Sequence, residues 1–388
     1  YLEVERLDIT AASFIHLSGP AAFEFGPTYL VDVATGLPAN LATAASSLIQ
    51  PIFDNLLEGA GLTIVEPFST IQGLEVRSIT MSTLGMDGFA GYGTPDFDSN
   101  LSGQDGLIGF GFEDADIALA LFKSTIPISV IPKFTAIKAD IDSFEAYGFG
   151  EKVQIKGRGI HLLLNTGTDW PANLGTPVID FANSFPGDDE TPAGFPVRTP
   201  LGNDPIYLDF DGNQRIGVEI DYALVSFFDF LHVEGAFAFE KGPQMLVDIS
   251  TGLSQIAAPA IQSLWDSATS IFDSSILGST TLTDDGYTIT DVDVSGFVIG
   301  AHDVNAFAGF GLKTSIIDVP ESTTDRPLGD LLANETLRAD LVGFSLSGLD
   351  LGAAFMEATL NDFLPASFQI PTWTTVHAEV DSFEFLDG

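Results

Sequence analysis

Phe14-Ile15-His16-Leu17-Ser18-Gly19 is the stretch that decides the interpretation of the fold, because it returns later as Phe230-Leu231-His232-Val233-Glu234-Gly235. The offset between the two strings is 216 residues (230 − 14). At the same offset, Leu30–Leu37 corresponds to Leu246–Leu253. Self-similarity at a fixed period is the sequence signature of a repeat architecture.

The agreement continues towards the carboxyl end with larger offsets. Phe89–Gly93 corresponds to Phe307–Gly311 at an offset of 218 (307 − 89), and Asp142–Glu145 to Asp381–Glu384 at 239 (381 − 142). The extra residues of the second copy fall in polar, Pro-containing stretches, where loops tolerate insertions. The sequence therefore predicts two repeat units, residues 1–215 and residues 216–388. The second unit is incomplete and carries an insertion near residues 313–338.

Alternation of apolar and polar residues at period two predicts a mainly β fold. It occurs in residues 1–5, 78–81, 144–154, 344–348 and 376–385, which we interpret as strands. Apolar residues three and four apart predict one amphipathic helix per unit, at residues 37–57 and 253–277, packed on a sheet. Pro51 and Pro259 fall inside these stretches, so a kink is expected in each.

The composition restricts the possible partners. The chain has 388 residues and a formal net charge of −40, which repels nucleic-acid phosphates and anionic lipids. No apolar run is long enough for a membrane helix, so we expect no membrane insertion. There is no Cys, which excludes disulfides and thiolate metal sites. The dense negative charge favours a salty or calcium-containing medium.

No reactive constellation stands out, and we expect no enzyme activity. The matched pair His16 and His232 lies between apolar residues, which is typical of structural histidines. The sequence has no Gly-x-Ser-x-Gly, His-Glu-x-x-His or phosphate-loop motif. Gly157-Arg158-Gly159 and Gly106–Gly111 lack the helix and basic residue of a phosphate loop, and we interpret both as glycine-relieved bends in strands.

Two acidic loops are candidate calcium sites. Asp209, Asp211 and Asn213 alternate around Gly212, and Asp96, Asp98 and Asn100 have the same spacing. Neither loop has the Glu at position twelve of an EF-hand, and a plain solvated acidic turn remains the alternative. Structural Ca²⁺ is the one cofactor that the sequence suggests.

The string Phe-x-His-[Leu/Val]-x-Gly followed by a Phe-x-Phe pair, with Tyr207–Gly212 just upstream of the second copy, resembles the long repeats of giant secreted bacterial proteins. These are the adhesin-like extracellular proteins of marine and other aquatic bacteria, some with calcium-binding modules. The resemblance implies an extracellular structural or adhesive role and supplies no catalytic residue. The chain has no Gly-Gly-x-Gly-x-Asp nonapeptides, which distinguishes it from the calcium β-roll toxins.

These observations together favour an extracellular or cell-surface structural protein that forms a filament, surface layer, sheath or adhesin stalk. We expect it to associate with neighbouring repeats or subunits through the strands at Tyr1–Leu7 and Val376–Phe385. A calcium-dependent module that binds a glycan or a surface is the first alternative. A two-carboxylate glycoside hydrolase is the second.

Overall fold

The computed structural model describes most of the chain. The described residues are 1–36, 63–65, 69–126, 131–150, 152–168, 176–242, 245–250, 252, 263, 281–283, 288–313, 317, 320, 322–358 and 372–388. The predicted helices at 37–57 and 253–277 lie outside them, apart from Ser263.

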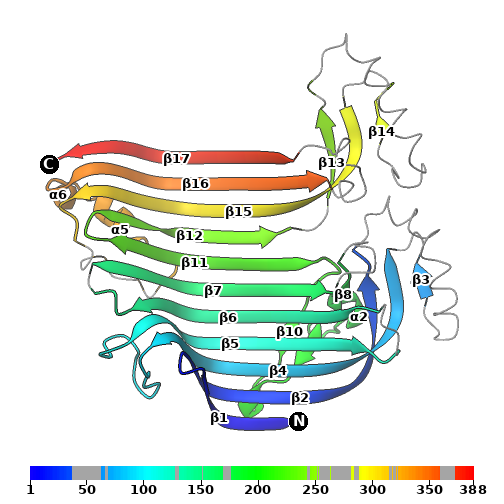
Figure 1. Cartoon of the computed structure of the whole chain (residues 1–388). Coiled ribbons are helices and arrows are strands. Elements are labelled where there is room, and N and C mark those ends of the chain that lie inside the picture. Colours follow the sequence, from blue (N-terminus) through cyan, green and yellow to red (C-terminus); the bar gives the residue numbers. More distant parts are fainter. Residues whose placement is uncertain are drawn as a thin grey trace.

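One large antiparallel sheet forms the body of the molecule (Figure 1). Its first strands are β1 (Leu2–Ala11), β2 (Ile15–Ala34), β4 (Thr70–Tyr92), β5 (Ile108–Ser124), β6 (Lys133–Tyr147) and β7 (Val153–Gly167). It continues through β11 (Arg215–Phe227), β12 (Leu231–Lys241), β15 (Thr288–Phe310), β16 (Val342–Ala358) and β17 (Trp373–Asp387). These strands follow one another in space in the order of the chain, so β1 and β17 form the two opposite edges.

Short elements complete the structure. The remaining strands are β3 (Thr63–Val65), β8 (Val178–Asp180), β9 (Phe195–Val197), β10 (Ile206–Leu208), β13 (Met245–Ser250) and β14 (Thr281–Leu282). The helices are α2 (Phe181–Ser184), the 3₁₀ turn η1 (Pro200–Gly202), α5 (Pro327–Ala333) and α6 (Glu335–Arg338). Among the described residues, no helix has the length and apolar character that a bilayer crossing requires.

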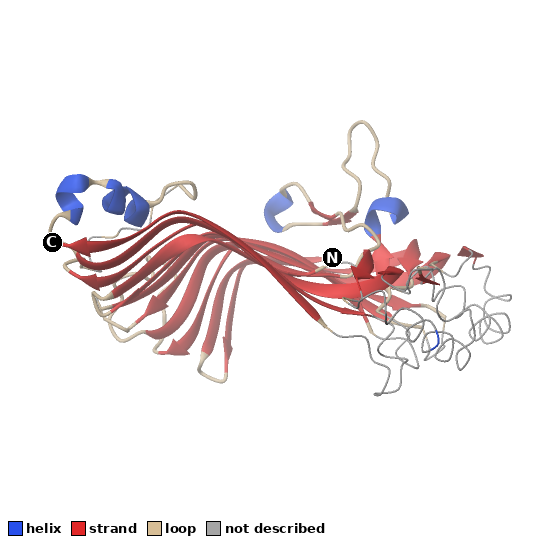
Figure 2. Ribbon diagram, turned by 90° about the horizontal axis from the view of Figure 1, so that it is seen from above, coloured by secondary structure: helices blue, strands red, loops and turns tan. Residues whose placement is uncertain are grey.

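The long strands are interrupted by β-bulges. Side chains of the adjacent strands accept hydrogen bonds from backbone N–H groups at these bulges. At six of them a residue with positive φ donates its backbone N–H to an Asp or Asn on the adjacent strand, which satisfies a group that has left the ladder. The donor and acceptor pairs are Gly73–Asp32, Gly85–Asp116, Asp114–Asp87, Asp291–Asp248, Asp303–Asp350 and Gly348–Asn305, at 2.8–3.2 Å. The last three pairs occupy the repeat positions of the first three. Bulges increase the local twist, and Figure 2 shows a sheet that twists strongly along its strands.

The first hairpin of each predicted unit has the same pairing. Leu2 faces Phe23 in β1–β2, and Val218 faces Phe239 in β11–β12, with a register shift after Val4 and after Ile220. Both turns are closed by a backbone bond, from Phe14 to Ala11 at 3.1 Å and from Phe230 to Phe227 at 3.0 Å. The two central residues of each turn have positive φ, namely Ala12, Ser13, Phe228 and Asp229. Positions 216 residues apart thus have the same local structure.

Inserted segments cover one side of the sheet near both ends of the strands (Figure 2). Residues 178–210 bring Phe181, Phe195 and Phe210 onto a core made by β2, β4, β5 and β6. At the other end, residues 322–341 bring Leu328 and Leu332 of α5 onto Tyr222 and Phe307. The burial of these apolar side chains stabilises the covered side of the sheet.

The strand predictions can be compared with the described elements. Residues 78–81, 344–348 and 376–385 fall in strands, as do residues 2–5 of the stretch predicted at 1–5, and the mainly β class is confirmed. The single strand predicted at 144–154 is wrong, because the chain reverses between Tyr147 and Val153. Gly148 and Gly150, both with positive φ, supply the turn.

Candidate functional site

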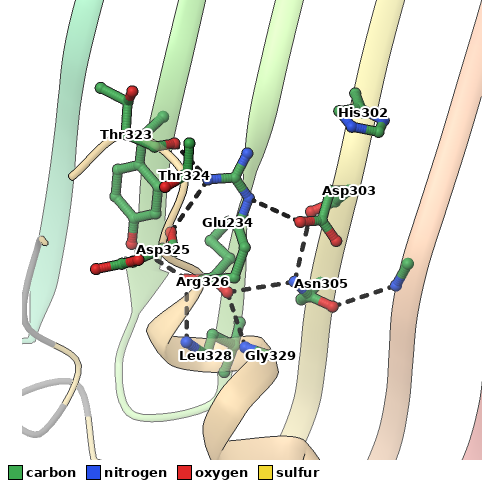
Figure 3. A network of polar contacts seen from close by, with 12 residues as sticks. Glu234, His302, Asp303, Asn305, Thr323, Thr324, Asp325, Arg326, Leu328 and Gly329 are labelled. Atoms are coloured by element: carbon green, nitrogen blue, oxygen red, sulfur yellow. Dashed lines mark hydrogen bonds and ion pairs between the residues drawn. The ribbon is translucent and has the colours of Figure 1, made fainter.

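Glu234 in β12 is a fully buried carboxylate, and four donors surround it (Figure 3). Its Oε1 accepts the backbone N–H of Gly329 at 2.8 Å and the Asn305 amide at 3.3 Å. Its Oε2 accepts the backbone N–H of Leu328 at 3.0 Å and the Tyr222 hydroxyl at 3.1 Å. Every oxygen of this buried group is therefore bound twice, as a buried carboxylate requires.

The carboxylate caps α5 from a neighbouring strand. The helix starts with Pro327, and Arg326 before it makes no side-chain cap. The first-turn N–H groups of a helix have no acceptor inside the helix, and Glu234 accepts two of them. A Cβ at Gly329 would come 2.7 Å from Asn305 Nδ2, so glycine permits the close approach.

Burial raises the pKa of Glu234, because the surroundings penalise the charged form, and the four donors offset part of this effect. Burial also raises the pKa of the Tyr222 hydroxyl, and the adjacent Glu234 carboxylate adds to the shift. The Tyr222 hydroxyl therefore keeps its proton and donates a hydrogen bond to Glu234.

Arg326 links this network to an open groove. Its Nη1 donates to the carbonyl of Thr323 at 2.8 Å, and its guanidinium lies 5.6 Å from the centre of the Tyr222 ring. Its Nε lies 3.3 Å from Asp303 Oδ2 in an ion pair whose N–H is not aimed at the carboxylate (Figure 3).

The groove has a volume of about 580 Å³ and lies over β11, β12 and β15. Its lining combines carboxylates, a guanidinium, hydroxyls and an aromatic ring, from Glu219, Asp221, Phe237, Asp303, Thr323 and Arg326. Such a lining can hydrogen-bond a polar ligand and stack against one flat face.

In the first predicted unit, a different set of polar contacts occupies the positions of this network. Ser18 occupies the position of Glu234, and its hydroxyl donates to Asp8 Oδ1 at 2.7 Å. Arg6 stands at the repeat position of Tyr222. Its Nη1 lies 2.5 Å from Oδ1 of Asp98, and this ion pair holds the loop that contains Asp98. Both units therefore fasten a loop to the same place on the sheet, one by a buried carboxylate and the other by an exposed ion pair.

The two matched histidines are packed alike. His16 Nδ1 lies 3.2 Å from Thr10 Oγ1, and His232 Nδ1 lies 3.0 Å from Ser226 Oγ. Each imidazole lies 6.4 Å, centre to centre, from a buried Phe on the next strand. Burial lowers the pKa of His232, which keeps the imidazole neutral. These contacts are those of core histidines.

The first predicted calcium loop is held by its own hydrogen bonds. Asp96 Oδ1 accepts the N–H of Asp98 at 3.1 Å, and Asn100 Oδ1 accepts the N–H of Ser102 at 2.6 Å. Asp98 pairs with Arg6, as described above. The side chains of Asp96, Asp98 and Asn100 thus lie in one turn, and each already has a protein partner.

The second predicted calcium loop follows β10. Asp209 Oδ1 pairs with Lys138 Nζ at 3.1 Å, and Asn213 donates its backbone N–H to the carbonyl of Asp211. Within the described ranges, no group of three or more His, Asp or Glu side chains has the arrangement of a metal site. The calcium sites stay predictions.

The edge strands are the second candidate site. In β17 the large apolar side chains stand in solvent, with Val376 64%, Val380 48% and Phe383 65% exposed. In β1, Tyr1 and Leu2 are exposed as well. Sheet edges with exposed apolar side chains offer backbone groups and surface to an added strand.

The sequence analysis identified the edge strands but missed Glu234 and Arg326. One signal was available: Ser18 and Glu234 differ between two strings that agree on both sides of them. A lone acidic residue inside an apolar strand is rarely buried without partners, and this exception points to a polar network. Comparison with protein-family models, curated proteins and solved structures gives no match to this chain.

Proposed function

We propose that this chain is an extracellular structural repeat protein that builds a filament, surface layer, sheath or adhesin stalk. In this proposal, neighbouring units extend one antiparallel sheet by adding strands at its edges. The observation that carries it is the position of β1 and β17 at the two edges of a single sheet whose hairpins repeat at 216 residues.

The join between the two predicted units supports the mechanism. There β11 pairs with β7 along the whole length of β11, from Arg215 opposite Asn165 to Phe227 opposite Val153. This ladder is similar in length to the β6–β7 ladder inside the first predicted unit, so the sheet continues across the predicted boundary at residue 215. Further units joined in the same way would lengthen the sheet, because each ladder needs only the edge of the one before it.

The charge sets a condition on assembly. Two copies each carrying −40 repel one another at low ionic strength. Salt screens exposed charges over about 8 Å at ~0.15 M, and bound Ca²⁺ would neutralise some of them. Assembly is therefore expected to strengthen with salt or calcium.

The test is the mass of the purified chain as a function of concentration, by analytical ultracentrifugation in about 0.5 M NaCl, where screening is short-ranged. We expect the average mass to rise with concentration and open fibres or layers to appear in electron micrographs. The double variant Val376→Lys with Val380→Lys places charges on the β17 edge and should reduce association. Leu121→Lys is the matched control, because Leu121 is 42% exposed on the internal strand β5. A monomer at every concentration and salt would refute the proposal.

A second candidate function rests on the groove beside Arg326. We propose there a polar ligand such as a surface glycan, because the groove combines hydrogen-bonding groups with Phe237. A glycan array with Arg326→Ala and Phe237→Ala tests it. If neither variant changes the bound sugars, this candidate fails.

A further inference from the structure

β17 is the counterpart of β6. Ser345 faces Glu384 in β16–β17 as Gly111 faces Glu145 in β5–β6. The two ladders keep this correspondence over their whole shared length, at offsets of 234 (345 − 111) and 239 (384 − 145). In each ladder one aspartate has no directly opposite partner, and it is the same repeat position in both: Asp142 in β6 and Asp381 in β17. What lies beside β6 therefore indicates what β17 is shaped to receive.

The strand beside β6 is β7, and three cationic or titratable side chains of β7 meet carboxylates of β6. Lys156 Nζ lies 2.9 Å from Glu145 Oε1, and Arg158 Nη1 lies 3.7 Å from Asp142 Oδ2. His161 Nδ1 lies 2.5 Å from Asp140 Oδ1, and this contact raises the pKa of the imidazole against the opposing effect of burial. β7 is thus matched to β6 by charge at three positions along the ladder.

β17 keeps all three carboxylates. Glu379, Asp381 and Glu384 stand at the positions of Asp140, Asp142 and Glu145. In β17, Glu379 Oε1 lies 3.3 Å from Nε2 of the neighbouring His377, and these two side chains are 75% and 80% exposed. Glu384 pairs with Arg338, and within the described residues no cation lies in ion-pair range of Asp381. Among the described strands, only β16 pairs with β17, so no basic strand lies beside this acidic edge as β7 lies beside β6.

The apolar side chains of β17 also indicate that this edge is shaped to receive a further strand. Ile137 and Ile141 of β6 face Leu164 and Ile160 of β7 and are partly covered. Their counterparts in β17 are Val376 and Val380, which are 64% and 48% exposed. An added strand would remove this surface from water.

Strand β1 of a second copy matches the charges of β17 less well than β7 does, so copies that meet directly depend on the salt screening described above. β11, the counterpart of β1, faces β7 with Glu219 and Asp221, and β1 has Glu3 and Glu5 at those positions. If β17 and β1 of two copies met directly, carboxylates would face carboxylates, which is unfavourable. A cationic strand between them removes the repulsion.

We propose that the edge of β17 binds an extended segment that carries basic side chains with the spacing Lys-x-Arg-x-x-His of β7, running antiparallel to β17. The segment places its basic residues against Glu384, Asp381 and Glu379. This inference rests on the proposed function, since it names the chemistry of the partner at one of the two edges through which assembly is proposed.

The test uses the full chain and a fluorescent peptide with the sequence of residues 152–168. Anisotropy at nanomolar to micromolar protein concentration should show saturable binding that weakens with salt. The peptide variant with Lys156→Glu and Arg158→Glu should bind about tenfold more weakly, because two attractions become repulsions. Asp381→Lys in the protein should weaken the natural peptide and improve binding of the Arg158→Glu peptide. Glu75→Lys makes the same change of charge on the internal strand β4 and should have no such effect.

The register is tested separately by cross-linking. The chain has no Cys, so introduced thiols are the only ones present. Thr135 faces Thr166 in β6–β7, and Thr374 is the counterpart of Thr135. Thr374→Cys should therefore form a disulfide with a Thr166→Cys peptide and not with a Leu164→Cys peptide.

The outcomes separate the inference from the proposed function. Binding in the stated register by a chain that never self-associates supports the inference and refutes assembly by this chain alone. Self-association that the peptide does not inhibit, together with no charge dependence or no cross-link at Thr374, overturns the inference and leaves the proposed function standing.

Discussion

Asn305 Oδ1 accepts the backbone N–H of Gly348 at 3.2 Å, across the bulge that joins β15 to β16. The same amide donates to Glu234 Oε1 at 3.3 Å. Asn305 therefore connects the bulge next to β17 with the buried carboxylate that holds α5. In the first predicted unit, Asp87 accepts the N–H of Asp114 in the same position at 3.0 Å.

Gly348→Ala should destabilise the protein. Gly348 has a φ of +62°, and an added Cβ would come 2.3 Å from Asp381 Oδ2 on β17. The left-handed conformation costs a non-glycine residue about 1–2 kcal/mol, and the displaced side chain adds to it. Chemical denaturation measures the loss. Gly352→Ala on the same strand is the control, because nothing lies within 4 Å of its added Cβ. Equal stability of both variants would show that the bulge geometry is not constrained.

Glu234→Ala should release residues 322–338 from the sheet. It leaves the buried N–H groups of Leu328 and Gly329 without an acceptor, which costs about 2–4 kcal/mol for two such groups. Hydrogen exchange should increase over α5 and leave the first hairpin unchanged. Ser18→Ala, at the matched position, removes one hydroxyl and should cost about 1 kcal/mol. Protection of α5 that survives Glu234→Ala would contradict the capping role.

His232 should make the stability depend on pH in the acid range. Its pKa is lowered by burial, so the unfolded chain binds the proton more readily than the folded chain. Stability is then full above the unfolded pKa of about 6.5 and is lost as the pH falls below it. Denaturation between about pH 7 and 5 should show a shallower slope for His232→Gln than for the natural chain.

The variant His377→Gln is the control for replacing a histidine outside the core, because the His377 side chain is 80% exposed. Glu234 acts in the opposite direction. Its raised pKa means that its contribution is largest when it is protonated and falls as the pH rises through its folded value. If the free energy of unfolding of His232→Gln fell more steeply with acid than that of the natural chain, the assignment of the pH dependence to His232 would be wrong.

Salt and calcium should both raise the melting temperature. The net charge of −40 makes repulsion a cost that about 0.5 M NaCl screens. At constant ionic strength, Ca²⁺ at about 1 mM should add a further increase if the acidic loops bind it, as weak extracellular sites do. Asp209→Asn with Asp211→Asn, and separately Asp96→Asn, should remove that increase, with Glu190→Gln as control. Identical melting curves in Ca²⁺ and Mg²⁺ would discard the calcium prediction.

The sequence predicted what depends on periodicity. Alternation located the strands at both edges, and the matched strings located two hairpins whose pairing is the same. The reversal at Gly148 was missed, because the apolar residues on both sides of Gly148 and Gly150 were interpreted as one strand although both glycines are turn signals. The sequence also did not indicate the bulges whose N–H groups are accepted by side chains. Asp114, Asp291 and Asp303 adopt positive φ there, and a glycine, the usual sequence signal of positive φ, is absent at these three positions. Glu234 was missed because its partners come from Tyr222, Asn305 and Leu328, which are distant in the chain.

The strand order of the sheet has a consequence for how the chain folds. Every principal strand pairs with the one that precedes it along the path from β1 to β17, so no strand has to be inserted between two that are already in place. All-β proteins usually fold slowly because their pairings are distant in sequence. Here each new strand needs only the edge left by the last one. Folding can therefore advance in the direction of synthesis, with one growing edge at a time, and no finished part has to reopen.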